Sequence, residues 1–169
     1  MADRFDKLAP RDLVITLRSL RRRFGGLASR AALDAAVMAA IDAPDGAEPS
    51  LRGRFEQAAQ AAALVENELS KALDHDDPVV AAAALDASER HFLDVPGTGM
   101  SPAQAVDALA DDAERAADRL ESAAATELTR AVRVAGGGTT TPAALGAELA
   151  RTEIGALSAI EDLLDRLAG

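Results

Sequence analysis

The side chains that could do acid–base or metal chemistry are few in this chain of 169 residues. His75 is followed directly by Asp76 and Asp77, and one imidazole beside two carboxylates could form a small metal or acid–base cluster. Asp77 also precedes Pro78, and an Asp-Pro pair is typical of a helix start, where the aspartate accepts from free backbone amides. We therefore favour a solvated turn here. The chain has no cysteine, which excludes a disulfide, a thiolate metal site and a cysteine nucleophile.

His91 is the second histidine, and it stands three residues before Asp94. On a helix these two positions share a face, so Asp94 could orient the imidazole for catalysis. A histidine near the C-terminal end of a helix also complements the helix dipole, and this structural interpretation is the favoured one. A site that joins His75 and His91 would need the chain to fold back between them, since a metal or catalytic site needs several convergent groups.

Glu153 is the third catalytic candidate. Glu148, Glu153 and Glu161 are acidic positions on a predicted helix over 141–167, and Glu153 lies beside its apolar stripe. Only if Glu153 turns inward would its pKa rise enough to indicate acid–base work. His75, His91 and Glu153 are thus the catalytic candidates, and we predict no metal site and no cofactor.

A cluster of arginines stands out on this acidic chain, at Arg18, Arg21, Arg22 and Arg23. Arg18 and Arg22 are four residues apart and could grip one carboxylate or phosphate, because a guanidinium matches such groups. Such a run is more often a solvated helix face whose arginines pair with neighbouring Asp and Glu. We predict the solvated face.

Glycines 136–138 form a short run that is typical of phosphate loops, yet no Lys-Ser or Lys-Thr pair follows them. The run therefore predicts a tight turn or a close backbone approach. The threonines at 139–141 precede the last predicted helix, and free amides at that helix start could still accept an anion.

The composition indicates an all-α protein. Hydrophobic residues make up 49% of the chain, but aromatic residues make up only 2% and there is no Trp or Tyr. The core must then be built from Leu, Val, Ile and many alanines, and alanine is the best helix former. A sheet would require more β-branched and aromatic residues.

Length and charge bound the class of protein. A chain of 169 residues predicts one domain over 1–169 with a sizeable core. The net charge of −10 repels phosphates and anionic lipids, so neither nucleic acid nor a membrane is expected as a partner. The start of the chain lacks an apolar signal core and no run approaches 18 apolar residues, which predicts a cytoplasmic protein.

Apolar residues recur at steps of three and four along four stretches, which predicts four long helices. The helices are expected at about 10–27, from an N-cap at Ser50 to about Asp74, from a capping box at 101–104 to about 120, and over 141–167. Their predicted seams include Leu13, Leu17, Leu20, Phe24 and Leu27, then Phe55, Ala58, Ala62, Val65, Leu69 and Ala72, then Val106, Leu109, Ala113, Ala116 and Leu120, then Leu145, Leu149, Thr152, Ala156, Ile160, Leu163 and Leu167. Asp112, Arg115 and Glu148 are among the polar residues expected mostly off these seams.

Shorter pieces connect the long helices. We predict an extra helix over 30–41, a loop over 43–49 and a helix over 78–93 that begins at the Asp77-Pro78 pair and is closed by the turn at 96–99. Residues 123–140 are expected to form an ordered crossover loop with short extended pieces. Four long helices joined by such connections predict a four-helix bundle with one or two short additional helices.

The order of four short motifs resembles the DinB/YfiT-like superfamily of bacterial four-helix bundles. The motifs are LAPRDLVITLRSL at 8–20, HDDP at 75–78, VAGGG at 134–138 and Arg151-Thr152. The likeness is greatest to an actinobacterial branch near the mycothiol-dependent maleylpyruvate isomerase metal-binding domains. This resemblance implies a divalent metal held by three histidines, one from the second long helix and an HxxxH pair from the last. Residues 51–73 and 141–169 contain no histidine, so the implied triad is absent.

Two functions follow as hypotheses. The first is a non-catalytic protein of this bundle type that binds a small molecule or associates with itself, as a homodimer through an Ala-rich helix face. The alternative is a divergent thiol-dependent, mycothiol-type transferase or isomerase that uses His75, His91 or Glu153. These two functions would be distinguished by the side chains that line a cavity between the helices near Ala156.

Overall fold

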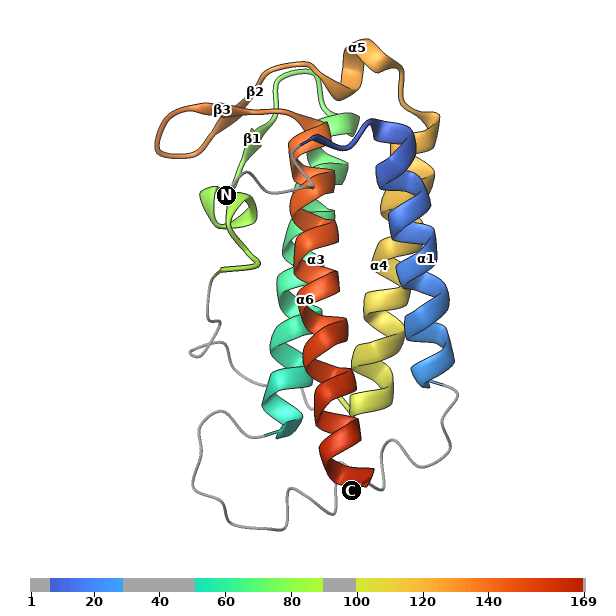
Figure 1. Cartoon of the computed structure of the whole chain (residues 1–169). Coiled ribbons are helices and arrows are strands. Elements are labelled where there is room, and N and C mark those ends of the chain that lie inside the picture. Colours follow the sequence, from blue (N-terminus) through green and yellow to red (C-terminus); the bar gives the residue numbers. More distant parts are fainter. Residues whose placement is uncertain (1–6, 29–50, 90–99, 169) are drawn as a thin grey trace.

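The computed structural model describes residues 7–28, 51–89 and 100–168 (Figure 1). The long helices are α1 (Pro10–Ala28), α3 (Leu51–Asp74), α4 (Pro102–Ser122) and α6 (Pro142–Ala168). The short elements are β1 (Val79–Val80), the 3₁₀ helix η2 (Ala82–Leu85), α5 (Ala125–Leu128), β2 (Val132–Val134) and β3 (Thr139–Thr140). The described chain is mostly helical with one small three-stranded sheet, which is compatible with the predicted all-α class.

The helix boundaries follow from capping residues. The Ser101 hydroxyl accepts from the Gln104 amide at 3.1 Å, and Gln104 Oε1 accepts from the Ser101 amide at 2.9 Å, which completes the predicted capping box of α4. Thr141 Oγ1 accepts from the Ala144 amide at 3.1 Å and opens α6. The predictions at 30–41, 43–49, Ser50 and 96–99 lie outside the described residues.

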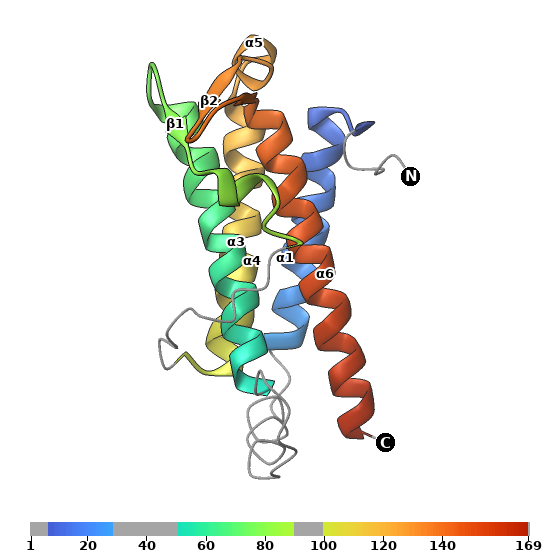
Figure 2. The same cartoon turned by 90° about the vertical axis from the view of Figure 1, so that its left-hand side faces the viewer.

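The long helices lie side by side in both views (Figures 1 and 2). Helix α1 packs mainly on α4, while α3 packs on both α4 and α6, and α6 also contacts α1. Most residues of the predicted seams form one buried cluster, and the side chains of Leu163 and Leu167 lie outside the described part of the structure. The most enclosed large side chains include Leu17, Phe24, Phe55, Leu109 and Leu149. Each such side chain contributes about 1.5–3 kcal/mol to stability by leaving water, so these apolar ridges hold the helices together.

The predicted helix over 78–93 is wrong in its described part. Val79 and Val80 instead form β1, which pairs in parallel with β2 through Val79↔Arg133 and Val80↔Val134. Strand pairing is favoured here because both residues are β-branched, which suits a strand, and because Val80 is fully buried in the core. A short 3₁₀ helix, η2, then replaces the expected α-helix.

The crossover at 123–140 contains more regular structure than a loop. A single helical turn, α5, comes first, and β2 and β3 then form an antiparallel hairpin. Gly136, Gly137 and Gly138 join these strands with φ values of 90°, 123° and 89°, which residues other than glycine rarely adopt. The glycine run is thus the tight turn that was predicted, and the extended pieces are confirmed.

The small sheet and α5 lie at one end of the long helices, where α3 ends and α6 begins (Figures 1 and 2). Within the described residues, no helix combines the length and the apolar character that crossing a membrane requires.

Candidate functional site

Glu153 turns inward from the middle of α6. Its exposed fraction is 0%, and it is one of the largest fully buried side chains of the described core. Neither Glu153 carboxylate oxygen has a hydrogen-bond partner among the residues that the structure describes. The nearby Thr152 hydroxyl is already used, because it donates to the Glu148 backbone carbonyl at 2.8 Å. Glu153 therefore meets the condition for acid–base work that the sequence analysis named, namely that its side chain turns inward.

Burial raises the pKa of Glu153 well above its usual value, and the nearby charge of Asp112 raises it further. An ionised carboxylate without partners is costly in an apolar interior, so burial favours the neutral form of Glu153. A neutral carboxylic acid can donate a proton or a hydrogen bond. What the described geometry lacks is an acceptor within reach.

Asp112 is the second buried acid, and its predicted place near the wet side of α4 is wrong. Only 3% of Asp112 is exposed, because it lies on the face of α4 that meets the other helices. Burial raises the pKa of Asp112 to about 6, and the Arg115 guanidinium lowers it while Glu66 raises it. Arg115 Nη2 donates to Asp112 Oδ1, so this carboxylate, unlike that of Glu153, has a partner.

Arg115 of α4 links this helix to α3 beside Asp112. Its Nε lies 3.7 Å from Glu66 Oε1 on α3, and the Ser70 hydroxyl donates to the same oxygen at 3.0 Å. The Arg115 guanidinium reaches Glu66 and Asp112 from the surface, since 56% of the Arg115 side chain is exposed. Glu66, Arg115, Asp112 and Glu153 thus form a polar layer across α3, α4 and α6, in which Glu153 alone is unpaired.

Two other buried acids have structural roles. Glu148 Oε1 accepts from the Ser88 amide at 2.8 Å and Glu148 Oε2 accepts from Arg151 at 2.6 Å, which ties the segment after η2 to α6. Glu68 Oε2 accepts from the Ala81 amide at 2.8 Å and ties the end of β1 to α3. The expectation that Glu148 lies off the buried face is wrong, because the chain after η2 covers it.

His75 is exposed in a turn after α3, as the structural interpretation predicts. Arg130 Nη2 donates to the backbone carbonyls of Ala72 and His75, which satisfies the end of the helix. Asp77 Oδ2 accepts from Arg133 at 2.8 Å. His91 lies outside the described residues, so a joint site of His75 and His91 stays untested. Within the described ranges, no three His, Cys, Asp or Glu side chains are grouped so that they could hold a metal ion.

The arginine cluster of α1 is a solvated face paired with acids. Arg18 contacts Asp118 and Glu121 of α4, Arg21 contacts Glu114, and Arg23 contacts Glu161 of α6. These ion pairs are largely exposed, so water and salt screen them and each contributes little to the stability of the fold. The prediction of a paired helix face is confirmed for these three arginines.

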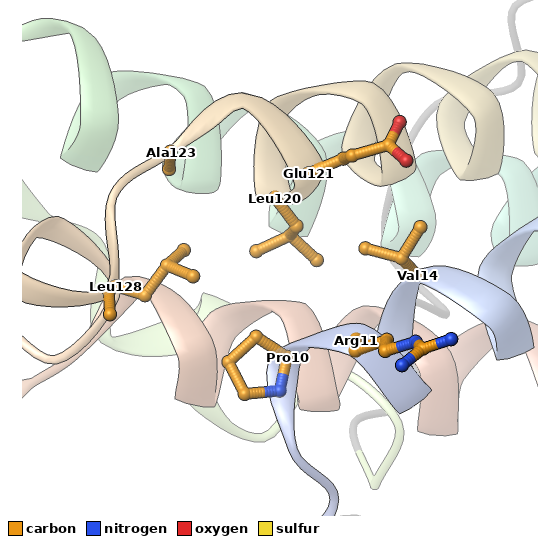
Figure 3. A pocket seen from close by; sticks show the side chains of 8 residues that line it. Pro10, Arg11, Val14, Leu120, Glu121, Ala123 and Leu128 are labelled. Carbon is orange, nitrogen blue, oxygen red and sulfur yellow. The ribbon is translucent and has the colours of Figure 1, made fainter.

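A pocket of about 280 Å³ opens between the start of α1, the end of α4 and α5 (Figure 3). Its lining residues are Pro10, Arg11, Val14, Leu120, Glu121, Ala123, Ala125 and Leu128. The side chains of Val14, Leu120 and Leu128 are buried and give it an apolar wall. Neither Glu153 nor Ala156 belongs to this lining, so the pocket is separate from the buried acids and from the place where a cavity was expected.

The charged residues of the pocket are Arg11 and Glu121, both at its exposed side. Arg18 donates to Glu121 Oε1 at 3.2 Å and to Glu121 Oε2 at 2.5 Å. This bidentate bond lowers the pKa of Glu121, which is thus ionised and held by an arginine. Arg11 has no such partner among the residues that the structure describes.

The pocket could not be predicted from the sequence because it depends on how α1, α4 and α5 meet. Val14 carries the one available signal, since it widens the apolar face of α1 beyond the Leu13–Leu17 seam. Leu128 falls within the predicted crossover loop at 123–140, and the structure places it in α5. The chain matches no family model, no curated protein and no solved structure.

Proposed function

We propose that this chain is a DinB-like four-helix-bundle protein, without the histidine triad of that superfamily, that binds a small molecule and does not transform it. The observation that carries the proposal is the apolar pocket between α1, α4 and α5, with two charged residues at its exposed side. Ligand sites usually combine an apolar wall with a few polar groups that orient the ligand. The absence of histidine from residues 51–73 and 141–169 argues against the metal chemistry that the resemblance implies.

The dimensions favour a small ligand. At about 280 Å³ the pocket is near the lower limit of typical ligand sites, which begin at roughly 300 Å³. A short alkyl chain lying on Val14, Leu120 and Leu128 would leave water, at a gain of up to about 0.8 kcal/mol for each methylene group. The pocket is open on one side, so we expect binding in the weak range unless a polar group adds to it.

Titration with a neutral alkyl probe tests the proposal. Hexanol is added to the methyl-labelled protein, and the methyl resonances of Val14, Leu120 and Leu128 are followed by NMR. We expect these resonances to shift and saturate, with butanol binding several-fold more weakly because two methylene groups are lost.

Neighbouring alanines provide matched variants. Ala123 lines the pocket, while Ala124 is exposed and does not line it, and both have extended backbones with φ/ψ of −79°/144° and −70°/152°. Ala123→Leu should fill the pocket and abolish the hexanol shifts, and Ala124→Leu should leave them unchanged. Equal hexanol binding by both variants would overturn the proposal, as would wild-type protein whose Val14, Leu120 and Leu128 resonances do not respond.

A divergent thiol-dependent transferase or isomerase is the second candidate, and Glu153 is the observation that favours it. A buried acid whose pKa is raised well above its usual value is typical of proton donors in enzymes. The test is turnover of maleylpyruvate in the presence of mycothiol. This function predicts that Glu153→Gln abolishes turnover while Glu127→Gln, the same change at an exposed position, does not. Wild-type protein without turnover would remove this candidate.

Self-association through a helix face is the remaining part of the proposal. The exposed large apolar side chains of the described residues are Ile15, Val79 and Leu85, and they belong to α1, β1 and η2. They are not gathered on one helix, so the pocket supports the binding function better than these residues support a dimer. Light scattering across a concentration series measures the oligomeric state directly.

A further inference from the structure

We infer that the molecule bound in this pocket carries a carboxylate that Arg11 binds, with its apolar body on Val14, Leu120 and Leu128. This inference rests on the proposed binding function and deepens it by naming the ligand class. The pocket has one cation and one acid, and they differ in whether another side chain already neutralises them.

Arg11 is the cation that remains available. It lines the pocket, it is exposed, and it forms no hydrogen bond or ion pair with any other residue that the structure describes. Other arginines of α1, in contrast, are paired with acids: Arg18 contacts Asp118 and Glu121, and Arg23 contacts Glu161. An unpaired guanidinium beside an apolar wall can form a two-pronged, charge-assisted hydrogen bond with a carboxylate.

Glu121 is the acid at the same pocket, and it is already satisfied. Both of its oxygens accept from Arg18, at 3.2 Å and 2.5 Å. A cationic ligand would have to displace Arg18 from Glu121, whereas an anionic ligand displaces nothing from Arg11. The Arg18 charge also offsets the repulsion that Glu121 would exert on an anion. The geometry therefore favours an anion over a cation.

The arrangement of the lining side chains fits an amphipathic molecule (Figure 3). Arg11 and the Glu121 carboxylate lie toward one end of the pocket, and Leu128 and Ala123 lie toward the other, with Leu120 between them. A ligand with its carboxylate at Arg11 would direct an alkyl or small ring body along Leu120 to Leu128. The class is thus a small monocarboxylate with an apolar body.

Three probes of equal chain length separate the charge from the apolar contact. Hexanoate, hexanol and hexylamine are titrated into the full chain at pH 7, and the methyl resonances of Val14, Leu120 and Leu128 report each dissociation constant. We expect hexanoate to bind about tenfold more tightly than hexanol, because a hydrogen bond to a charged group adds this much. Hexylamine should bind no more tightly than hexanol.

Two arginine variants of α1 complete the test. Arg11→Gln should lower the affinity for hexanoate about tenfold and leave hexanol unchanged, since it removes only the charged bond. Arg22→Gln is the matched control, because Arg22 is an exposed arginine of the same helix that does not line the pocket. It should change neither affinity.

The outcomes are distinguishable from those of the proposed function. If hexanol binds but hexanoate binds no better, or if Arg11→Gln and Arg22→Gln weaken hexanoate equally, the carboxylate inference is overturned and the binding function stands. If hexylamine binds most tightly, the ligand is a cation and the inference is again overturned. If none of the three probes moves the Val14, Leu120 and Leu128 resonances, both proposals fall.

Discussion

Gly146 of α6 lies directly against Leu120 of α4. A Cβ atom at position 146 would stand 3.0 Å from Leu120 Cδ1 and 3.4 Å from Leu120 Cδ2. Contacts this short require the leucine to move, so glycine at this position sets where Leu120 lies. Because Leu120 also lines the pocket, the contact between Gly146 and Leu120 positions one wall of the proposed binding site.

Two glycines of α6 provide a matched pair of substitutions. Gly155 is exposed with nothing within 4 Å of its Cβ position, so Gly155→Ala should stabilise the protein by about 0.5–1 kcal/mol through helix propensity alone. Gly146→Ala gains the same propensity but displaces Leu120, so its net gain should be smaller. Urea denaturation measures both. Equal stabilisation, with Leu120 methyl resonances unmoved in Gly146→Ala, would contradict the close contact.

Glu153 makes the stability of the protein depend on pH. Its folded-state pKa is raised, so the unfolded chain ionises at Glu153 first as the pH rises, and stability should fall from about pH 4.5 upward. Asp112 adds a fall in the same direction between about pH 3.8 and 6. Glu153→Gln removes one ionisation and should therefore raise the stability of the protein relative to the wild type at pH 7, with little effect at pH 4.

Urea denaturation of the wild type and Glu153→Gln across pH 4–8 checks this sign. Glu127→Gln is the control, because Glu127 is exposed and makes no side-chain hydrogen bond among the described residues. It should leave the pH profile unchanged. A Glu153→Gln profile that runs parallel to the wild type would show that folding does not raise the pKa of Glu153.

Glu148 holds the segment after η2 against α6. Glu148→Ala leaves the Ser88 amide and the Arg151 guanidinium without this acceptor, so we expect a loss of about 1–3 kcal/mol in the free energy of unfolding. Faster hydrogen exchange at the Ser88 amide should accompany the loss. Unchanged exchange at Ser88 would mean that this hydrogen bond does not hold the segment.

Leu109 tests the packing of the core. Its side chain is fully buried in α4, so Leu109→Ala should lower the free energy of unfolding by about 2–5 kcal/mol. Ile15 of α1 is 55% exposed, and Ile15→Ala should cost about 0.5 kcal/mol or less. Similar losses at Leu109 and Ile15, measured by denaturation, would show that the apolar seam is not the core.

The long helices could be predicted because their signals are local. Apolar spacing gave the seam of α1, and the Ser101 and Thr141 side chains bond to amides only three residues away. The strand β1 could not be predicted in this way. Val79 and Val80 pair with Arg133 and Val134, which lie more than fifty residues later, so their conformation depends on a distant segment.

The buried acids also divide into those with a local signal and those whose burial depends on distant segments. Periodicity placed Glu153 beside the stripe of α6, which was enough to name it as a candidate. The burial of Asp112 and Glu148 was missed because it depends on partners from elsewhere, namely the other long helices for Asp112 and the Ser88 segment for Glu148. The pocket was missed for the same reason, since the distance from Pro10 to Leu128 along the chain hides their closeness in space.

Intermolecular NOE measurement on the hexanol complex tests the central claim most directly, because it locates the bound molecule. The account predicts NOEs from the alkyl protons of hexanol to the methyl groups of Val14, Leu120 and Leu128, and their loss in Ala123→Leu. NOEs confined to residues outside this pocket, or a saturated titration with no NOE to any of these three side chains, would contradict it.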